Sequence, residues 1–228
     1  MSSSYFTPAT FRFLKDLAGN NSREWFKANQ QRYEEHVREP ALDFITDFTG
    51  ELAEISPHLV ADARKVGGSL FRIQRDTRFA NDKTPYKTNT GVQFRHELAK
   101  DAHAPGIYLN IEPGRCFMGV GLWMPETRIA GQIRDHMAAN QQAWIAATRA
   151  EPFASTFALG GESLVRPPKG FTADHPLIDD LKRKSFIATA DLTQKQVTSP
   201  SFLADFAQLC RTGSPLMRFL CAAVGVKY

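Results

Sequence analysis

The sequence predicts an α+β protein: a single domain spanning residues 1–228, with a central, mainly antiparallel sheet of about four to five strands flanked by N-terminal and C-terminal helices. Three observations support this. Apolar residues recur at helical spacing through residues 7–57, alternate with polar residues through 70–123, and return to helical spacing with one further strand through 125–228. We find no repeat, low-complexity tract or linker that would divide the chain.

The first region predicts three helices. Thr7 and Pro8 suit the cap and first turn of a helix that ends near residues 19–20. A second helix begins at residue 21 or 22, and its apolar stripe contains one amide, Asn29, which either lines a cavity or caps a neighbouring element. Pro40 is expected to end it, and a third helix runs on to Pro57.

The middle region predicts four strands over residues 71–76, 92–98, 106–112 and 115–123. Pro113-Gly114 fits the centre of a type II turn and joins the last two strands into a hairpin. In the register with Glu112 facing Arg115, one face is apolar. Its residues are Ile107, Leu109 and Ile111 opposite Val120, Met118 and Cys116.

The last region predicts one long helix after Pro125 and an irregular stretch over residues 152–175. A short helix over 177–184 and a strand over 185–191 follow. Two closing helices are expected, each opened by a Ser-Pro pair, at Ser199-Pro200 and Ser214-Pro215.

Composition is ordinary for a soluble globular protein, with 43% hydrophobic and 23% charged residues, so disorder is not expected. The N-terminal residues lack the pattern of a signal peptide, and no apolar stretch is long enough to cross a bilayer. Three isolated cysteines, with no CxxC pair, favour a reducing compartment. We therefore expect a cytoplasmic protein that does not contact membranes.

The segment RIQRDTRFANDKTPYK, residues 72–87, concentrates the charge of the chain. It holds five basic and two acidic residues, so it carries +3 of the formal net charge of +4. Arginine and lysine donors at the end of a strand suit the oxygen atoms of phosphate or carboxylate groups. The alternative is a surface loop in which the two aspartates pair with neighbouring arginines.

The candidate site residues follow from this segment and from the polar face of the predicted sheet. The expected ligand-binding residues are Arg72, Arg75, Arg78, Lys83, Tyr86, Lys87, Tyr108 and Asn110. Asp76 is the candidate catalytic residue, as an orienting group or general base. The two tyrosines would supply hydroxyl donors or stacking surfaces.

The polar face itself has two interpretations. Its expected members are Arg72, Gln74, Asp76, Gln93, Arg95, Tyr108, Asn110 and Glu112. It is either the ordinary solvated face of an antiparallel sheet or, if helices cover both faces, the floor of a cavity. Gly119 and Gly121 on this face leave room for a close approach to the backbone.

A second basic run, within residues 166–184, carries five basic and three acidic residues. Cations at a helix C-terminus are favourable without any ligand. Together with the first segment, however, it would suit an anionic partner if the two segments met in space.

Motifs for common chemistries are absent from the sequence. It holds no GxxxxGK[ST], HExxH or GxSxG motif, and its histidines lack metal-ligand spacing. We predict no cofactor and no metal, although Asp76, Asp82 and Glu112 would suit magnesium if they converged.

These observations favour a protein that binds a small anionic ligand, with phosphate as the favoured anionic group. Alternatives are a nucleic-acid-binding protein that uses the same basic segments, a phosphoryl or ester hydrolase, and a module whose charged loop docks an acidic protein. Whether the chain is an enzyme is left open, since no pair of nucleophile and base is visible.

Four blocks of the chain resemble one bacterial family of conserved hypothetical proteins, domain of unknown function 2461. They are NNSREWFKANQQRYEE (20–35), FRIQRDTRFANDKTPYKTN (71–89), GIYLNIEPGRCFMGVGLWMPE (106–126) and PPKGFTADHPLIDDLKRKSF (167–186). The blocks cover nearly the whole chain in order. The resemblance implies membership of that family and brings no activity or site residue with it.

Overall fold

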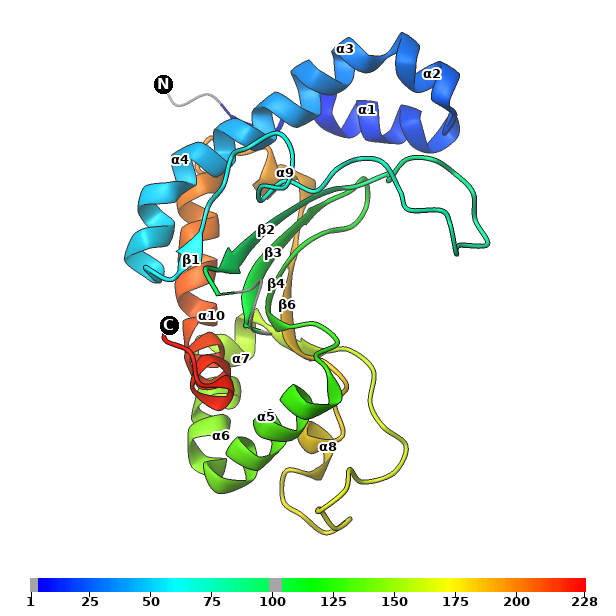
Figure 1. Cartoon of the computed structure of the whole chain (residues 1–228). Helices are drawn as coiled ribbons and strands as arrows, with labels where there is room; N and C mark the ends of the chain where they lie inside the picture. Colours follow the sequence, from blue (N-terminus) through cyan, green and yellow to red (C-terminus); the bar gives the residue numbers. More distant parts are fainter. Residues whose placement is uncertain (1–3, 99–103) are drawn as a thin grey trace.

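The computed structural model describes residues 4–98 and 104–228, and in this part of the chain six strands form one antiparallel sheet in the order β1-β2-β3-β4-β6-β5 (Figure 1). The predicted α+β class is confirmed. The strands are β1 (Leu59–Val60), β2 (Thr90–His96), β3 (Gly106–Ile111), β4 (Cys116–Leu122), β5 (Ala158–Gly160) and β6 (Phe186–Leu192).

Helices precede and follow the sheet. Those before it are α1 (Pro8–Gly19), α2 (Arg23–Ala28), α3 (Gln30–Tyr33), a π-helical turn η1 (Glu34–Arg38) and α4 (Glu39–Ile55). Those after it are α5 (Thr127–Ala139), α6 (Gln141–Arg149), α7 (Phe153–Thr156), α8 (Ile178–Leu181), α9 (Gln194–Val197) and α10 (Phe202–Val224). None of the helices described is both long and apolar enough to span a membrane.

The main core lies between the sheet and the helices α4 and α10, which cover the same face (Figure 1). Phe48 of α4 contacts Phe94 of β2 and Phe206 of α10, with ring centroids 5.0 and 5.1 Å apart. Burial of these aromatic side chains supplies much of the stabilisation. The interpretation in which helices cover both faces is therefore wrong, because the long helices α4 and α10, from the two ends of the chain, share the apolar face.

A second, smaller core joins α1, α2 and α3 to the charged segment. Its members are Phe13, Leu14, Leu17, Phe26, Tyr33, Val37, Ile73 and Tyr86. In Figure 1 these helices project beyond one end of the sheet, and the loop that follows β1 runs beneath them. The second core therefore holds the charged segment at this end of the sheet.

The hairpin between β3 and β4 has the predicted turn and register. The Arg115 N–H donates to the Glu112 carbonyl at 3.0 Å, and Gly114 has φ +81°, as the third position of a type II turn requires. Ile107 pairs with Val120 and Leu109 with Met118. Alternation alone thus identified the buried face correctly.

The predicted strand over residues 71–76 is not a regular strand. Only isolated bridges form, between Leu70 and Val92 and between Gln74 and Tyr86. The reason is that the chain runs beside β2 only at residues 70–71 and then pairs with residues 85–87 of its own segment. The Arg75 N–H donates to the Pro85 carbonyl at 2.9 Å, and Ile73 turns into the second core.

Several predicted helix boundaries are also wrong. Pro40 lies in the first turn of α4, where the missing N–H costs little, so the chain continues through η1 into α4. Pro215 lies inside α10, which is one continuous helix. Conversely, the single long helix predicted after Pro125 is two helices, α5 and α6, which meet at Asn140. The Asn140 side-chain amide donates to the His136 carbonyl at 2.9 Å and ends α5.

Two short strands were not predicted, β1 within residues 57–70 and β5 inside the stretch expected to be irregular. Runs of two and three residues are too short to show alternation. Asn29 proves to be the cap between α2 and α3. Its amide donates to the Trp25 carbonyl at 2.9 Å, and its oxygen accepts from Arg32 at 2.9 Å.

Candidate functional site

The charged segment doubles back on itself beside the start of β2. The Lys87 N–H donates to the Ile73 carbonyl at 2.8 Å, which brings the two ends of the segment together. The side chain of Asn21 pairs with the backbone of Tyr86, donating at 2.9 Å and accepting at 3.1 Å. The segment is therefore fixed to both the sheet and the helical cores rather than extended into solvent.

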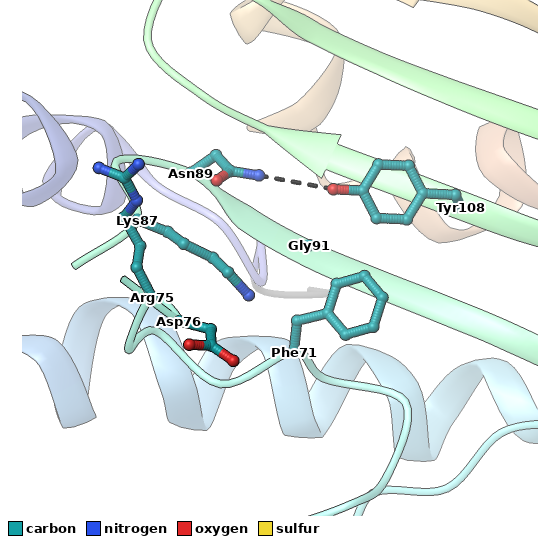
Figure 2. A pocket seen from close by; sticks show the side chains of 7 residues that line it. All are labelled: Phe71, Arg75, Asp76, Lys87, Asn89, Gly91 and Tyr108. Atoms are coloured by element: carbon teal, nitrogen blue, oxygen red, sulfur yellow. Dashed lines mark hydrogen bonds between the residues drawn. The ribbon is translucent and has the colours of Figure 1, made fainter. Parts of the chain in front are cut away.

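An open pocket of about 420 Å³ lies between this segment and the second face of the sheet (Figure 2). It is lined by Phe71, Arg75, Asp76, Lys87, Asn89, Gly91 and Tyr108. The structure thus brings together four of the residues singled out from the sequence: Arg75, Asp76, Lys87 and Tyr108. The other three lining residues, Phe71, Asn89 and Gly91, were not among the predicted site residues.

Lys87 is the central cation of this pocket. Its ammonium donates to the Arg72 carbonyl at 2.9 Å and lies 5.2 Å from the centre of the Phe71 ring. Figure 2 shows it pointing into the space between Phe71 and Asp76. Burial and, secondarily, the charge of Arg72 lower the pKa of Lys87. No carboxylate among the residues described lies within ion-pair distance of the Lys87 ammonium.

Arg75 is held on the wall of the pocket by the return of the segment. One of its Nη atoms contacts both the Asp82 carboxylate and the Thr84 hydroxyl. The backbone N–H of Thr84, followed by Arg75 and the Thr84 hydroxyl, lowers the pKa of Asp82 to about 2. The guanidinium is therefore anchored through one nitrogen, and its side chain stays 28% exposed.

Replacing Asp82 with asparagine tests this anchor. The Asp82 pKa is below its unfolded value of 3.8, so the carboxylate stabilises the fold above about pH 4 and loses that contribution as the pH falls through about 2. We expect the melting temperature of the wild type to drop more steeply than that of Asp82→Asn between these values. Thermal unfolding followed by circular dichroism across this range measures the difference. Parallel profiles would contradict the anchor.

Neutral donors line the opposite wall. The Asn89 amide donates to Asn110 Oδ1 at 2.6 Å and lies 3.5 Å from the Tyr108 hydroxyl, and the buried Asn110 donates in turn to the Arg115 carbonyl at 2.8 Å. Burial raises the pKa of Tyr108, so its hydroxyl stays protonated. Asn110 supports this wall without lining the pocket itself.

Gly91 on β2 allows the two aromatic rings to flank the pocket. A Cβ atom at this position would lie 2.7 Å from the Tyr108 hydroxyl and 2.9 Å from Cδ2 of Phe71. Any larger residue would displace at least one ring. The sequence offered no signal for this role, because the close approach depends on how the segment crosses β2.

Asp76 lines the pocket but is engaged by Arg78. The guanidinium donates to both carboxylate oxygens, at 3.0 and 2.6 Å, and these bonds lower the pKa of Asp76. A carboxylate with a lowered pKa is a weaker base, which disfavours the general-base role and leaves the role of orienting group. Arg78 itself is 77% exposed and lies outside the pocket lining.

The other predicted residues lie around this pocket without lining it. The Lys83 ammonium donates to the Thr77 carbonyl at 2.9 Å, and Arg72 is exposed. Tyr86 is buried and stacks on Phe26 with ring centroids 4.2 Å apart, so its ring already has a partner. Tyr86 borders an adjacent pocket of about 400 Å³, which also touches Arg75 and Lys87.

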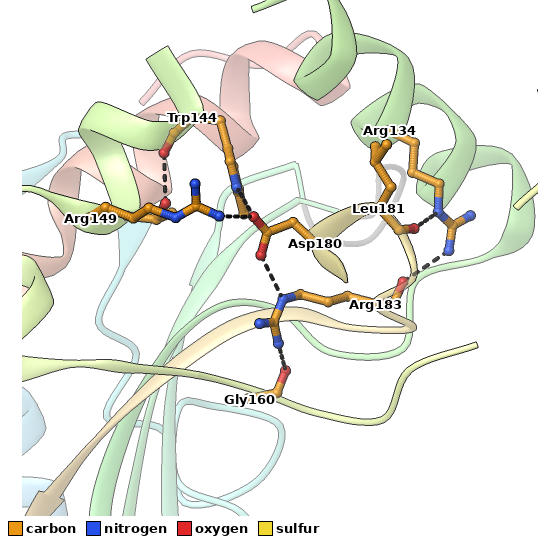
Figure 3. Close-up of polar contacts among 8 residues, drawn as sticks. Arg134, Trp144, Arg149, Gly160, Asp180, Leu181 and Arg183 are labelled. Atoms are coloured by element: carbon orange, nitrogen blue, oxygen red, sulfur yellow. Dashed lines mark hydrogen bonds and ion pairs between the residues drawn. The ribbon is translucent and has the colours of Figure 1, made fainter. Parts of the chain in front are cut away.

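The second basic run lies at the other end of the sheet from the charged segment (Figure 1). One of its cations, Arg183, is bonded to the buried carboxylate of Asp180, which also accepts from Arg149 and Trp144 (Figure 3). These contacts join α6 to α8. The two basic segments therefore do not form one continuous patch.

No metal site is evident. Within the described ranges, no group of three or more His, Cys, Asp or Glu side chains could hold an ion. Asp76 and Asp82 each pair with an arginine, and Glu112 accepts from Thr88 at 3.3 Å. The space beside Gly121 is filled by the Phe186 carbonyl of β6 rather than left open for a ligand.

Comparison with known proteins gives a family but no activity. Residues 9–219 match the model of a family described as conserved hypothetical protein (DUF2461). No curated protein matches the chain.

Proposed function

This chain belongs to the DUF2461 family of conserved hypothetical proteins, and we propose that it binds a small anionic, phosphorylated ligand in the pocket between the charged segment and β2. The observation that carries the proposal is the Lys87 ammonium. It is half-buried in the pocket that Arg75 also lines, with no carboxylate partner among the described residues. A cation withdrawn from water without a counterion is costly, and an anionic ligand would offset that cost.

The rest of the pocket suits the same ligand class. Arg75 keeps N–H donors beyond the nitrogen that Asp82 and Thr84 engage. Opposite it, the Asn89 amide and the Tyr108 hydroxyl form a neutral polar wall, in which both groups donate to Asn110. The volume of about 420 Å³ is in the range of small-molecule sites. Phosphate and carboxylate groups both have oxygen acceptors that match these donors.

A specific observation favours nucleic acid as a second candidate. Phe79 is 95% exposed at the outer part of the segment, and the Arg78 guanidinium lies 5.9 Å from its ring centre. An exposed aromatic ring beside cations is typical of proteins that stack unpaired bases. Hydrolysis ranks below both candidates, because the candidate base Asp76 has a lowered pKa.

Thermal-shift measurements with inorganic phosphate, AMP and a short oligothymidine, at low and moderate salt, test the proposal. A ligand at a hundred times its Kd should stabilise the fold by about 2.7 kcal/mol. We expect Lys87→Met to weaken phosphate or AMP binding about tenfold to a hundredfold, because a charged hydrogen bond is lost. Methionine keeps most of the apolar stem, so the free variant should melt no lower than the wild type.

Lys83→Met is the matched control. Lys83 lies in the same segment and also donates to a backbone carbonyl, but it does not line this pocket. The control should bind AMP like the wild type. Equal losses in both variants would point to general electrostatic attraction, and a shift with oligothymidine alone that vanishes as salt rises would favour the nucleic-acid candidate.

A further inference from the structure

Lys87 differs chemically from the other cations of the charged segment. Arg75 is bonded to Asp82 and Arg78 to Asp76, whereas the Lys87 amine contacts a carbonyl oxygen and the face of an aromatic ring. Both contacts leave the nitrogen free of any carboxylate among the described side chains. An arginine would serve as well for anion binding alone, but only lysine offers an amine that can lose its proton.

Two features of its surroundings, half-burial and the neighbouring charge of Arg72, favour the neutral form of the amine, whereas its contacts with the Arg72 carbonyl and the Phe71 ring favour the ammonium. The Phe71 ring shields one side of the amine from water, and the charges of Arg72 and Arg75 lie on the same segment. The Arg95 guanidinium lies 5.8 Å from the centre of the same ring. Asp76 borders the same pocket but is engaged by Arg78. Burial and a neighbouring cation are the two conditions that activate a lysine as a nucleophile, and the lowered pKa of Lys87 is consistent with them.

We infer that the Lys87 amine forms an imine with a carbonyl compound that also bears a phosphate or carboxylate group, with Arg75 binding the anionic group and Tyr108 facing the carbonyl. This inference rests on the proposed function, because the anionic group is what brings the carbonyl to the amine. The pocket is wide enough for a small molecule of this kind, and both groups are on its lining.

The reaction is a condensation and needs no other reactant. The neutral amine adds to the carbonyl carbon, forming an N–C bond and a carbinolamine. The C–O bond of the carbinolamine then breaks, the oxygen leaves as water with the two protons of the amine, and the C=N bond forms. The Tyr108 hydroxyl stays protonated and lines the same pocket; it donates to Asn110 Oδ1 at 3.3 Å in the free protein and would turn this proton toward the departing oxygen.

Reductive trapping tests the inference. The purified full chain is incubated with pyruvate or with dihydroxyacetone phosphate in sodium cyanoborohydride, which reduces an imine to a stable amine. Peptide mass mapping then locates the adducts. We expect Lys87 to be labelled clearly above Lys83, because a lowered pKa raises the neutral fraction of the Lys87 amine and because only Lys87 lines the pocket that would hold the anionic group of the probe. The two probes distinguish a carboxylate ligand from a phosphate ligand.

Lys87→Arg separates the imine from anion binding. Arginine keeps the positive charge but offers no nucleophilic amine, so this variant should keep most of the thermal shift with inorganic phosphate and lose the trapped adduct. Equal labelling of Lys83 and Lys87 would overturn the inference, as would the absence of an adduct from a wild-type protein that phosphate stabilises. The absence of both adduct and stabilisation would overturn the proposed function as well.

Discussion

Replacing Gly121 with alanine is expected to destabilise the protein by about 4 kcal/mol or more, the largest effect that we predict for a change of one methyl group. Gly121 has φ +118°, a conformation that residues with a side chain rarely adopt. A Cβ atom there would lie 2.1 Å from the Phe186 carbonyl oxygen and 3.1 Å from the Cα of Ile187. Because both atoms belong to the backbone of the paired strand β6, the clash is relieved only by separating β4 from β6.

Gly119→Ala is the matched control for this prediction. Gly119 lies two residues earlier on the same strand and the same face, but a Cβ atom there would be 3.8 Å from its nearest neighbours. We expect Gly119→Ala to change the free energy of unfolding by no more than about 0.5 kcal/mol. Urea unfolding of both variants measures the contrast. Equal effects would mean that the backbone of Gly121 is not constrained by β6.

Replacing Asp180 with alanine is expected to cost about 3 to 5 kcal/mol. The carboxylate is 4% exposed and accepts from Trp144 Nε1 at 2.8 Å, from Arg149 at 2.8 Å and from Arg183 at 3.3 Å (Figure 3). Its removal leaves the fully buried Trp144 indole N–H without an acceptor and the Arg183 guanidinium, 18% exposed, without its counterion. Unpaired buried polar groups of this kind are among the most destabilising changes known in proteins.

Two further variants separate the causes. Asp180→Asn keeps an oxygen acceptor but removes the charge. Its free energy of unfolding should therefore lie between that of the wild type and that of Asp180→Ala. Glu162→Gln breaks the exposed pair between Glu162 and Lys184 nearby and should leave urea unfolding unchanged, because exposed ion pairs contribute little. If Asp180→Ala unfolded like Glu162→Gln, the network would not hold α6 to α8.

The elements with a clear periodic signal were predictable from the sequence. The β3–β4 hairpin followed from alternation and from Pro113-Gly114, because a turn is determined by the local backbone preferences of its own residues. The elements that were mispredicted depend on distant partners. Pro215 was expected to open a helix, but packing of α10 across the sheet outweighs one lost hydrogen bond, and Ser214 donates to the Cys210 carbonyl at 3.0 Å.

The same division applies to the candidate site. Charge counting located the segment of residues 72–87, but it treated its five cations as equivalent. Lys83 and Lys87 have the same side chain, yet only the second lines the pocket beside β2. Lys87 lies on the returning part of the segment opposite Ile73, whereas Lys83 lies farther out, opposite Thr77. Asn89 and Gly91 gave no signal, since their roles depend on Tyr108 of the neighbouring strand.

The α+β class, the buried face of the hairpin and the position of the charge follow from periodicity and composition, because these are local properties of the chain. Which charges are available to a ligand depends on how the chain folds. The pairs Asp76–Arg78 and Asp82–Arg75 form once the segment has folded back, and the second core holds it against β2. The position of the Lys87 amine in the pocket results from these contacts between distant parts of the chain.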